Sequence, residues 1–175
     1  MGKTNILDTI YYLSFTKSAF NASDSSNIKH EEEMAMIKGY YSNSEEEEML
    51  VTCGLKRGIK KQFRRGTKDY KRLIDHIGLI PLVMVSPKDS ELIAEGSDER
   101  RRFMDSVISQ YDRTYLEHLQ EYSGLIKQRN AMLKIEEQSA DNELFDIIEL
   151  QMIPHAEYIY QKRSQFIELF IPHFQ

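Results

Sequence analysis

The sequence has no tryptophan, one cysteine and four prolines in 175 residues. Cys53 has no second cysteine with which to form an internal disulfide, which is typical of proteins from reducing compartments. There is no apolar run of about eighteen residues or more, and the N-terminus lacks the basic-then-apolar pattern of a secretory signal. These absences argue against a disulfide scaffold and a transmembrane helix. They predict a soluble, cytoplasmic protein without a membrane partner.

Charge is distributed unevenly along the chain. The formal net charge of −5 argues against a protein whose whole surface binds nucleic acid. Residues 56–72, however, carry nine basic side chains and a single acid, Asp69. Basic side chains along a strand suit contact with a phosphate backbone, and they equally suit protection of an exposed sheet edge against aggregation. Both interpretations stay open. The candidate DNA contacts are Lys56, Arg57, Lys60, Lys61, Arg64 and Arg65.

The rest of the chain is organised around residues 81–105. Pro81–Val85 is a short apolar run rich in β-branched residues, which predicts a buried strand. Ser86 and Pro87 end this strand, and a helix is expected to begin after Gly96. Before this junction the pattern predicts mostly strands, and after it only helices. The predicted strands are Met34–Tyr41, Met49–Leu55 and Ile59–Phe63, which are followed by a short helix near residues 70–76.

Three helices are predicted in the second half of the chain. They cover about residues 99–111, 113–137 and 141–170. The short polar link between the last two predicts an antiparallel hairpin. Pro154 lies inside the third helix, which it would either kink or divide. The expected fold class is α+β, with an antiparallel strand meander in residues 1–86 and an all-helical lobe, containing a helix hairpin, in residues 87–175.

Three consecutive arginines occupy the first of these helices. Consecutive helical residues lie about 100° apart, so Arg100–Arg102 cannot all share one face. At least one of them is expected to point inward and to pair with a carboxylate, for which Asp98 and Asp105 are the candidates. The five histidines are scattered along the sequence and predict no metal site. No pairing of a nucleophile with a base stands out.

The first residues combine a phosphate-binding sequence with a helix. Gly2-Lys3-Thr4 matches the end of a phosphate-binding loop, in which the lysine contacts phosphates and the threonine hydroxyl binds Mg²⁺. Three residues are a weak match, and a lysine near a helix start is the alternative. The apolar helix that follows at once favours the functional interpretation. Its expected apolar face consists of Ile6, Ile10, Tyr12 and Leu13.

Three segments together resemble the RecF family of SMC-like ABC-type ATPases. They are the opening GKTN with its helix, the motif SPKDSELIAEGSDERRRFMD at residues 86–105, and YLEHLQEYSGLIKQRNAMLK at residues 115–134. The motif at 86–105 is the most specific, and Lys88 departs from it because the family usually has an acid there. Its matching residues are Ser86, Pro87, Asp89, Leu92, Ile93, Gly96, Arg101, Arg102, Phe103 and Asp105. The resemblance covers this chain but only about the first half of a family member.

The resemblance implies a nucleotide-binding ATPase lobe followed by a helical lobe. By position, Gly2, Lys3 and Thr4 correspond to the end of the Walker A loop, with Lys3 on the ATP phosphates and Thr4 on Mg²⁺. Ser86 and Asp89 fall at a Q-loop-like joint that reports nucleotide state from one lobe to the other. The chain is expected to begin inside Walker A, and it lacks the front of that loop, the Walker B acids and the signature motif.

The resemblance also implies partners for the parent protein. Family members dimerise around ATP, bind single- and double-stranded DNA, and act with RecO and RecR to load RecA at gaps during DNA repair, replication and recombination, within the SOS response. The fragment by itself is expected to be inactive, with no catalytic residue and no tightly bound cofactor. Two alternatives are a helical protein-interaction module and a part of another SMC-like DNA repair ATPase.

Overall fold

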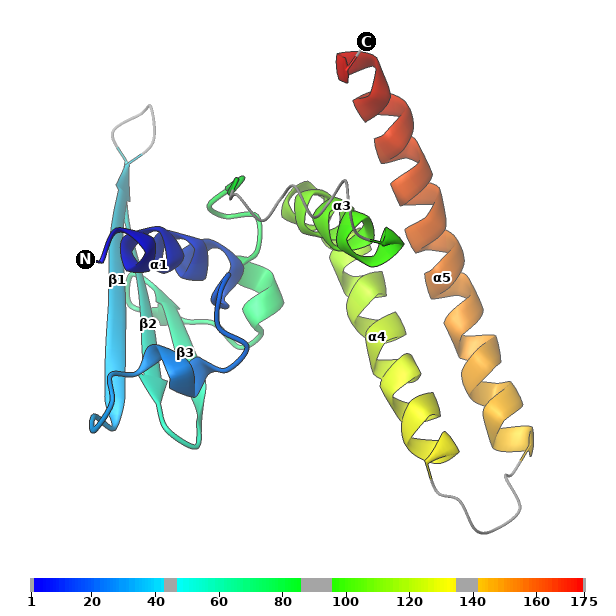
Figure 1. Ribbon diagram of the computed structural model, residues 1–175, viewed down its shortest axis with the longest axis horizontal. Coiled ribbons are helices and arrows are strands. Elements are labelled where there is room, and N and C mark those ends of the chain that lie inside the picture. The colour runs from blue at the N-terminus through cyan, green and yellow to red at the C-terminus, as the bar shows by residue number, and fades with distance from the viewer. Residues whose placement is uncertain (1, 43–46, 86–95, 135–141, 175) are drawn as a thin grey trace. The chain divides into compact units, whose positions relative to one another are not determined.

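The structure, a computed structural model, describes residues 2–42, 47–85, 96–134 and 142–174 (Figure 1). The chain divides into two units, Met1–Val85 and Ser86–Gln175. The first unit contains one helix and a small sheet, and the second unit is helical. This is the α+β combination that the sequence predicts. Each unit is described by itself below.

The sheet of the first unit is an antiparallel meander of four strands. Its order is β1-β2-β3-β4, so every strand pairs with its neighbour in the sequence. Gly58 and Gly66 have positive φ angles, of 70° and 58°, at the turns that follow β2 and β3. Because residues that carry a side chain rarely adopt a positive φ, glycine suits both turns. The strands are β1 (Met34–Ser42), β2 (Glu48–Lys56), β3 (Ile59–Arg65) and β4 (Lys68–Asp69).

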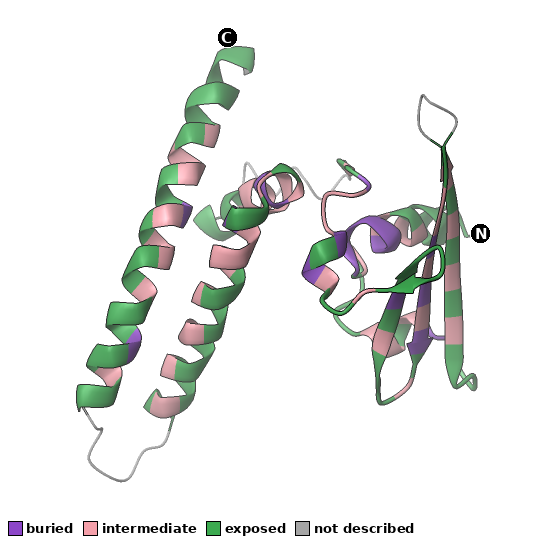
Figure 2. Cartoon of the chain, turned by 180° about the vertical axis from the view of Figure 1, so that it is seen from behind, coloured by how far each residue is buried: buried purple, intermediate pink, exposed green. Residues whose placement is uncertain are grey.

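One face of the sheet forms the core of this unit. Val51, Cys53 and Leu55 alternate along β2 and are buried, as the sequence predicts, and Phe63 of β3 pairs with Cys53. Figure 2 shows buried residues gathered where helix α1 (Lys3–Phe15) meets the sheet. Burial raises the pKa of the Cys53 thiol to about 12. The thiol of the single cysteine is therefore protonated and has little reactivity.

Helix α1 buries its last turn against the sheet. Tyr12 and Leu13 are buried, whereas Ile6 and Ile10 are 64% and 40% exposed. Of the expected apolar face, Tyr12 and Leu13 are therefore buried and Ile6 and Ile10 are not, because no described element covers that side of the first turns. At the last turn a Cβ added to Gly39 of β1 would come within 2.6 Å of Leu13 Cδ1, so a side chain there would require Leu13 or Tyr41 to shift.

Two buried hydrogen bonds tie the end of α1 to residues 73–80. His76 ends a short 3-10 helix (Leu73–His76), and its Nε2 bonds to the carbonyl oxygen of Leu13. Ser14 donates its hydroxyl to the carbonyl oxygen of Ile80 at 2.6 Å. Both acceptors are backbone carbonyls that would otherwise be buried without a donor. The last turn of α1 is thereby held in place from two sides.

The expected buried strand at Pro81–Val85 is wrong. These residues have no regular secondary structure, and Val83 and Val85 are 67% and 83% exposed. A strand requires a neighbouring edge that supplies hydrogen-bond partners, and none of the four described strands pairs with this segment. The β-branched composition alone therefore did not produce a strand.

The second unit consists of three helices and a terminal 3-10 turn. They are α3 (Ser97–Tyr111), α4 (Arg113–Leu133), α5 (Asn142–Phe170) and the turn Ile171–Phe174. Helices α4 and α5 pack against each other as the predicted hairpin (Figure 1). Pro154 lies inside α5, and the helix continues through it, so the proline does not divide the helix. The core contains Ile108, Tyr115 and Ile159, one from each helix.

A partly buried ion pair connects α3 to α5. Arg163 makes two hydrogen bonds to the carboxylate of Asp105, at 2.9 Å and 2.8 Å, and Tyr115 of α4 donates its hydroxyl to the same carboxylate. The expectation that one of Arg100–Arg102 would point inward is wrong, whereas the expected pairing with Asp98 is present. All three are exposed, and Arg101 pairs with Asp98 in the same helix. The arginine that pairs with Asp105 comes from a distant part of the sequence.

None of the described helices is long and apolar enough to cross a membrane.

The burial of His76 generates a pH prediction for the first unit. Burial lowers the pKa of His76 from its ordinary value of about 6.5, and the charge of Arg65 lowers it further, against the effect of the Leu13 hydrogen bond. The neutral ring therefore belongs to the folded state. Its contribution to stability is complete above about pH 6.5 and is lost as the pH falls through the lowered pKa.

We expect urea unfolding at about pH 5 to show a larger loss of stability relative to about pH 7 for the unaltered chain than for His76→Gln. Glutamine keeps a side-chain N–H that can donate to Leu13 but does not titrate. His30→Gln is the matched control, because His30 is exposed. An equal pH dependence of the unaltered chain and His76→Gln would contradict the assignment.

Candidate nucleotide and nucleic-acid sites

The start of α1 is an exposed helix N-terminus without a side-chain cap. Gly2 precedes the helix with a φ of 119°, which strongly favours glycine, and Lys3 and Thr4 form the exposed first turn. No acidic side chain lies in that turn and no side chain caps it. The backbone N–H groups and the positive end of the helix dipole are thus not compensated by the described residues, which suits an anion. Lys3 and Thr4 can add a charge and a hydroxyl.

Ser86 and Asp89, the expected joint, lie outside the described residues. Their role as a joint therefore stays a prediction. So does the short helix expected around Leu92 and Ile93, which falls in the same range.

The six basic residues of the predicted DNA site have different environments. Arg57 is held by backbone carbonyls: its Nε donates to Glu32 at 2.9 Å, and its terminal nitrogens reach the carbonyls of Ser25, Ile28 and Lys29 at 3.4 Å. It clasps the loop that precedes β1 to the β2–β3 turn. Arg57 is therefore assigned a structural role by its contacts.

Lys61 is also engaged within the protein. Its Nζ lies 3.1 Å from a carboxylate oxygen of Asp24 and 5.3 Å from the centre of the Tyr12 ring. The Lys61 side chain is only 15% exposed. Tyr12 donates its hydroxyl to Asp24. Burial raises the pKa of Tyr12, and this hydrogen bond raises it further. Lys61 thus completes a cluster between α1, the following loop and β3.

The remaining basic residues are exposed, and strand alternation sorts them onto two faces. Arg64 pairs with Thr52, which in turn pairs with Lys38 of β1, so these three side chains lie in one row. This row belongs to the face opposite the core, which we call the outer sheet face and define by Met34, Met36, Lys38, Tyr40, Thr52, Lys56, Gln62 and Arg64. Arg64 there forms an exposed ion pair with Asp69. Lys38 also lies on this face, although it is outside the basic stretch 56–72. The alternation along β1 is the sequence signal that could have indicated it. Lys60 is exposed where the register between β2 and β3 shifts, so strand alternation does not assign it to a face.

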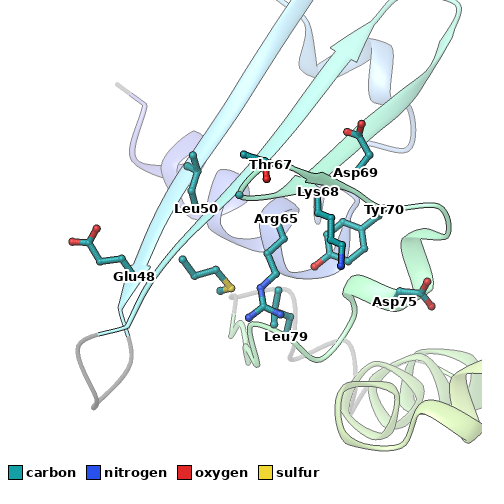
Figure 3. A pocket seen from close by; sticks show the side chains of 11 residues that line it. Glu48, Leu50, Arg65, Thr67, Lys68, Asp69, Tyr70, Asp75 and Leu79 are labelled. Atoms are coloured by element: carbon teal, nitrogen blue, oxygen red, sulfur yellow. The ribbon is translucent and has the colours of Figure 1, made fainter.

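Arg65 lies on the other face and lines a pocket near the β3–β4 turn (Figure 3). The pocket has a volume of about 660 Å³, and Arg65 and Lys68 occupy paired positions in its wall. Burial raises the pKa of Tyr70, which also lines it. Three carboxylates share the wall with these two cations, so the pocket has no strong preference for an anion. They are Glu48, Asp69 and Asp75.

Among residues 2–42, 47–85, 96–134 and 142–174, no group of three or more histidine, cysteine or acidic side chains is placed to hold a metal ion. The histidines are nevertheless less scattered in space than in sequence. His118 and His155, on α4 and α5, lie in contact.

Comparison with known proteins identifies relatives along the whole chain. No protein-family model matches it. The chain is 58% identical over 175 residues to the DNA replication and repair protein RecF of Phocaeicola vulgatus, and 55% identical over 175 residues to that of Bacteroides fragilis. Each match covers 100% of this chain and 47% of the relative. The RecF protein of Flavobacterium johnsoniae is 47% identical and is 49% covered.

A solved structure agrees with these matches. The structure described as the recombination mediator protein RecF-ATP in the RecFOR pathway superposes with a TM-score of 0.87 at 27% identity. It covers 95% of this chain, which spans 45% of that one. The chain thus spans about half the length of the relatives it matches. The predicted resemblance to RecF proteins is confirmed.

The different environments of the basic residues generate a prediction about stability. Arg57→Gln removes several hydrogen bonds to backbone carbonyls and should cost about 1–2 kcal/mol of unfolding free energy. Lys60→Gln, on an exposed side chain, should change it by about 0.5 kcal/mol or less. Urea unfolding of both variants measures the difference. Equal effects would show that Arg57 is not structural.

Proposed function

We propose that this chain forms part of a RecF-type DNA replication and repair ATPase. In this proposal residues 1–86 supply part of the nucleotide-binding lobe and residues 87–175 form the helical lobe. The observation that carries the proposal is the similarity to RecF proteins along the whole chain, at identities of up to 58%. A relative solved as RecF-ATP supports nucleotide binding in the complete protein.

The role of α1 in this proposal is to present phosphate ligands. Gly2 provides the backbone turn, Lys3 contacts the ATP phosphates and Thr4 contributes a hydroxyl to Mg²⁺. The positive φ of Gly2 and the uncompensated first turn support this assignment. ATP with Mg²⁺ supplies the transferable phosphoryl group. The tie between the end of α1 and residues 76–80 supports a fixed orientation of the helix that carries Lys3 and Thr4.

The chain by itself is proposed to be inactive. Phosphoryl transfer depends on positioning and on neutralising charge around the phosphates and the metal. This sequence holds the Gly-Lys-Thr end of a phosphate-binding loop without the glycine-rich residues that complete it. It also lacks the acidic residues that would hold the metal in a family member. Binding of Mg-ATP to the chain alone is therefore expected to be weak.

The DNA-binding surface is proposed to be the outer sheet face. Its basic residues Lys38, Lys56 and Arg64 are exposed, and so is Tyr40, which follows Met34, Met36 and Lys38 on this face of β1 and is 79% exposed. Basic groups around an exposed aromatic ring suit both the phosphates and the bases of nucleic acid. Arg57 and Lys61 are left out of the DNA-binding surface because their contacts are internal. Lys60 lies at the register shift between β2 and β3, and Arg65 lies on the opposite face.

Partners follow from the relatives and are proposals for the complete protein. These are an ATP-dependent homodimer, single- and double-stranded DNA, and the proteins RecO, RecR and RecA in the loading of RecA at gaps. A solved relative described as a recombination mediator in the RecFOR pathway supports this assignment. The Ser86 and Asp89 joint is proposed to transmit nucleotide state between the two units.

A second candidate function, a protein-interaction module, is favoured by one feature of α5. Ile147, Leu150, Ile153 and Tyr160 recur along this helix and are 51%, 66%, 57% and 73% exposed. Exposed apolar stripes of this kind often mark contact surfaces. A helical module and a part of a RecF-type ATPase are compatible.

The nucleotide proposal predicts that the isolated chain binds Mg-ATP with a dissociation constant of about 1 mM or weaker. Isothermal titration calorimetry at neutral pH measures it, with the full-length RecF protein of a relative as the positive control. Micromolar binding by the chain alone would show that the first turn of α1 is sufficient for binding.

The DNA proposal predicts a position-specific loss of salt-dependent binding. Substituting Lys38, Lys56 and Arg64 together by glutamine should weaken duplex binding and lower the slope of log affinity against log salt by about 2–3, since each phosphate contact contributes about 0.9. Fluorescence anisotropy with a labelled duplex measures both. The matched control substitutes Lys71, Lys127 and Lys134, which are exposed elsewhere and carry the same charge. Equal losses in the two triple variants would refute the assignment of the face.

A further inference from the structure

Two of the five histidines meet between the helices of the hairpin. His118 on α4 and His155 on α5 are 37 positions apart in the sequence, and their Nδ1 atoms lie 3.1 Å apart. Both side chains are half-buried. Their rings are arranged edge to face, with centroids 4.9 Å apart and planes inclined at 62°. Two imidazole nitrogens on different helices therefore lie within hydrogen-bond distance of each other.

Neighbouring side chains hold His118 in this orientation. The His118 ring stacks on the ring of Tyr158, at a centroid distance of 4.2 Å and an interplanar angle of 11°. The Nζ of Lys162 lies 5.4 Å from the centre of the Tyr158 ring. Lys162 also forms an ion pair of 2.7 Å with Asp112 at the start of α4. Farther along the hairpin, Arg129 of α4 forms an ion pair with Glu149 of α5 at 2.8 Å. Contacts between the two helices thus fix the approach of the two rings.

The separation of the two nitrogens is close to the bite of a metal chelate. A tetrahedral zinc ion bound by nitrogens at about 2.0–2.1 Å places two of them about 3.3 Å apart. Without metal, one Nδ1 must carry a proton and the other must accept it. With metal, both Nδ1 atoms need a free lone pair, so the proton of the donor moves to its own Nε2. A neutral pair then binds the ion without a net release of protons from the imidazoles.

We propose that His118 and His155 form a two-imidazole site for a first-row divalent metal ion that bridges α4 and α5. The described part of the chain adds no third histidine, cysteine or acidic ligand there, so water completes the coordination. Structural zinc sites have four protein ligands, and a site with two is exchangeable. The ion acts as a removable clamp on the hairpin. This site is independent of the ATP and DNA proposals.

The first test titrates Zn²⁺ into the whole chain and measures heat by calorimetry. We expect one zinc ion per chain, and an affinity at least about tenfold weaker in His118→Gln and in His155→Gln. His30→Gln and His173→Gln are the matched controls, because both residues are exposed and lie outside the pair. Binding unchanged by either pair substitution would mean an adventitious ion only and would overturn the proposal. Absence of binding to the unaltered chain would overturn it equally.

The second test needs no variant and therefore stands if a substitution disturbs the fold. Nitrogen-detected NMR of the imidazoles should show one Nδ1–H tautomer in the pair without metal. Saturating Zn²⁺ should convert both rings to the Nε2–H tautomer, with both Nδ1 signals shifted. Zinc should also raise the unfolding temperature of the chain as its free concentration exceeds the dissociation constant. Signals that shift at Nε2 instead, or only at His30 and His173, would refute the site.

Discussion

The packing of the last turn of α1 against the sheet is the contact on which the first unit depends. Leu13 approaches β1 at Gly39, Tyr12 lies in the core, and buried hydrogen bonds from His76 and Ser14 complete the contact. This arrangement leaves the first turn of α1 exposed and directs one sheet face inward. The first turn of α1, on which the nucleotide proposal rests, and the outer sheet face, on which the DNA proposal rests, are therefore both exposed among the described residues.

The helical unit depends in a similar way on polar contacts between its helices. Arg163 of α5 binds Asp105 of α3, and Tyr115 of α4 donates to the same carboxylate, so one carboxylate links all three helices. Such a network is directional, and apolar packing alone is not. It sets the register of α5 against α4, and this register brings His118 beside His155. The metal site that we propose is thus a product of the hairpin register.

The basic residues show why a sequence pattern overstates a binding site. Residues 56–72 look uniformly basic in the sequence. Arg57 nevertheless donates to backbone carbonyls, and Lys61 contacts a carboxylate and an aromatic ring. Their partners lie in residues 12–32, far away in the sequence, and no local pattern reveals them. Conversely, Lys38 joins the outer sheet face through strand pairing. Strand alternation could have identified Lys38, but only once the register between β1 and β2 was known.

The sequence by itself determined the α+β class, the strand meander, the helix hairpin and the resemblance to RecF proteins. These depend on local periodicity, turn residues and short motifs, which are written in neighbouring positions. The tertiary structure decided which turn of α1 is buried, that Pro81–Val85 is not a strand, and that Arg163 rather than one of Arg100–Arg102 meets Asp105. Each of these depends on whether a distant element provides a covering surface, a strand edge or a counter-charge. The spacing of residues along the chain does not reveal which distant elements come together.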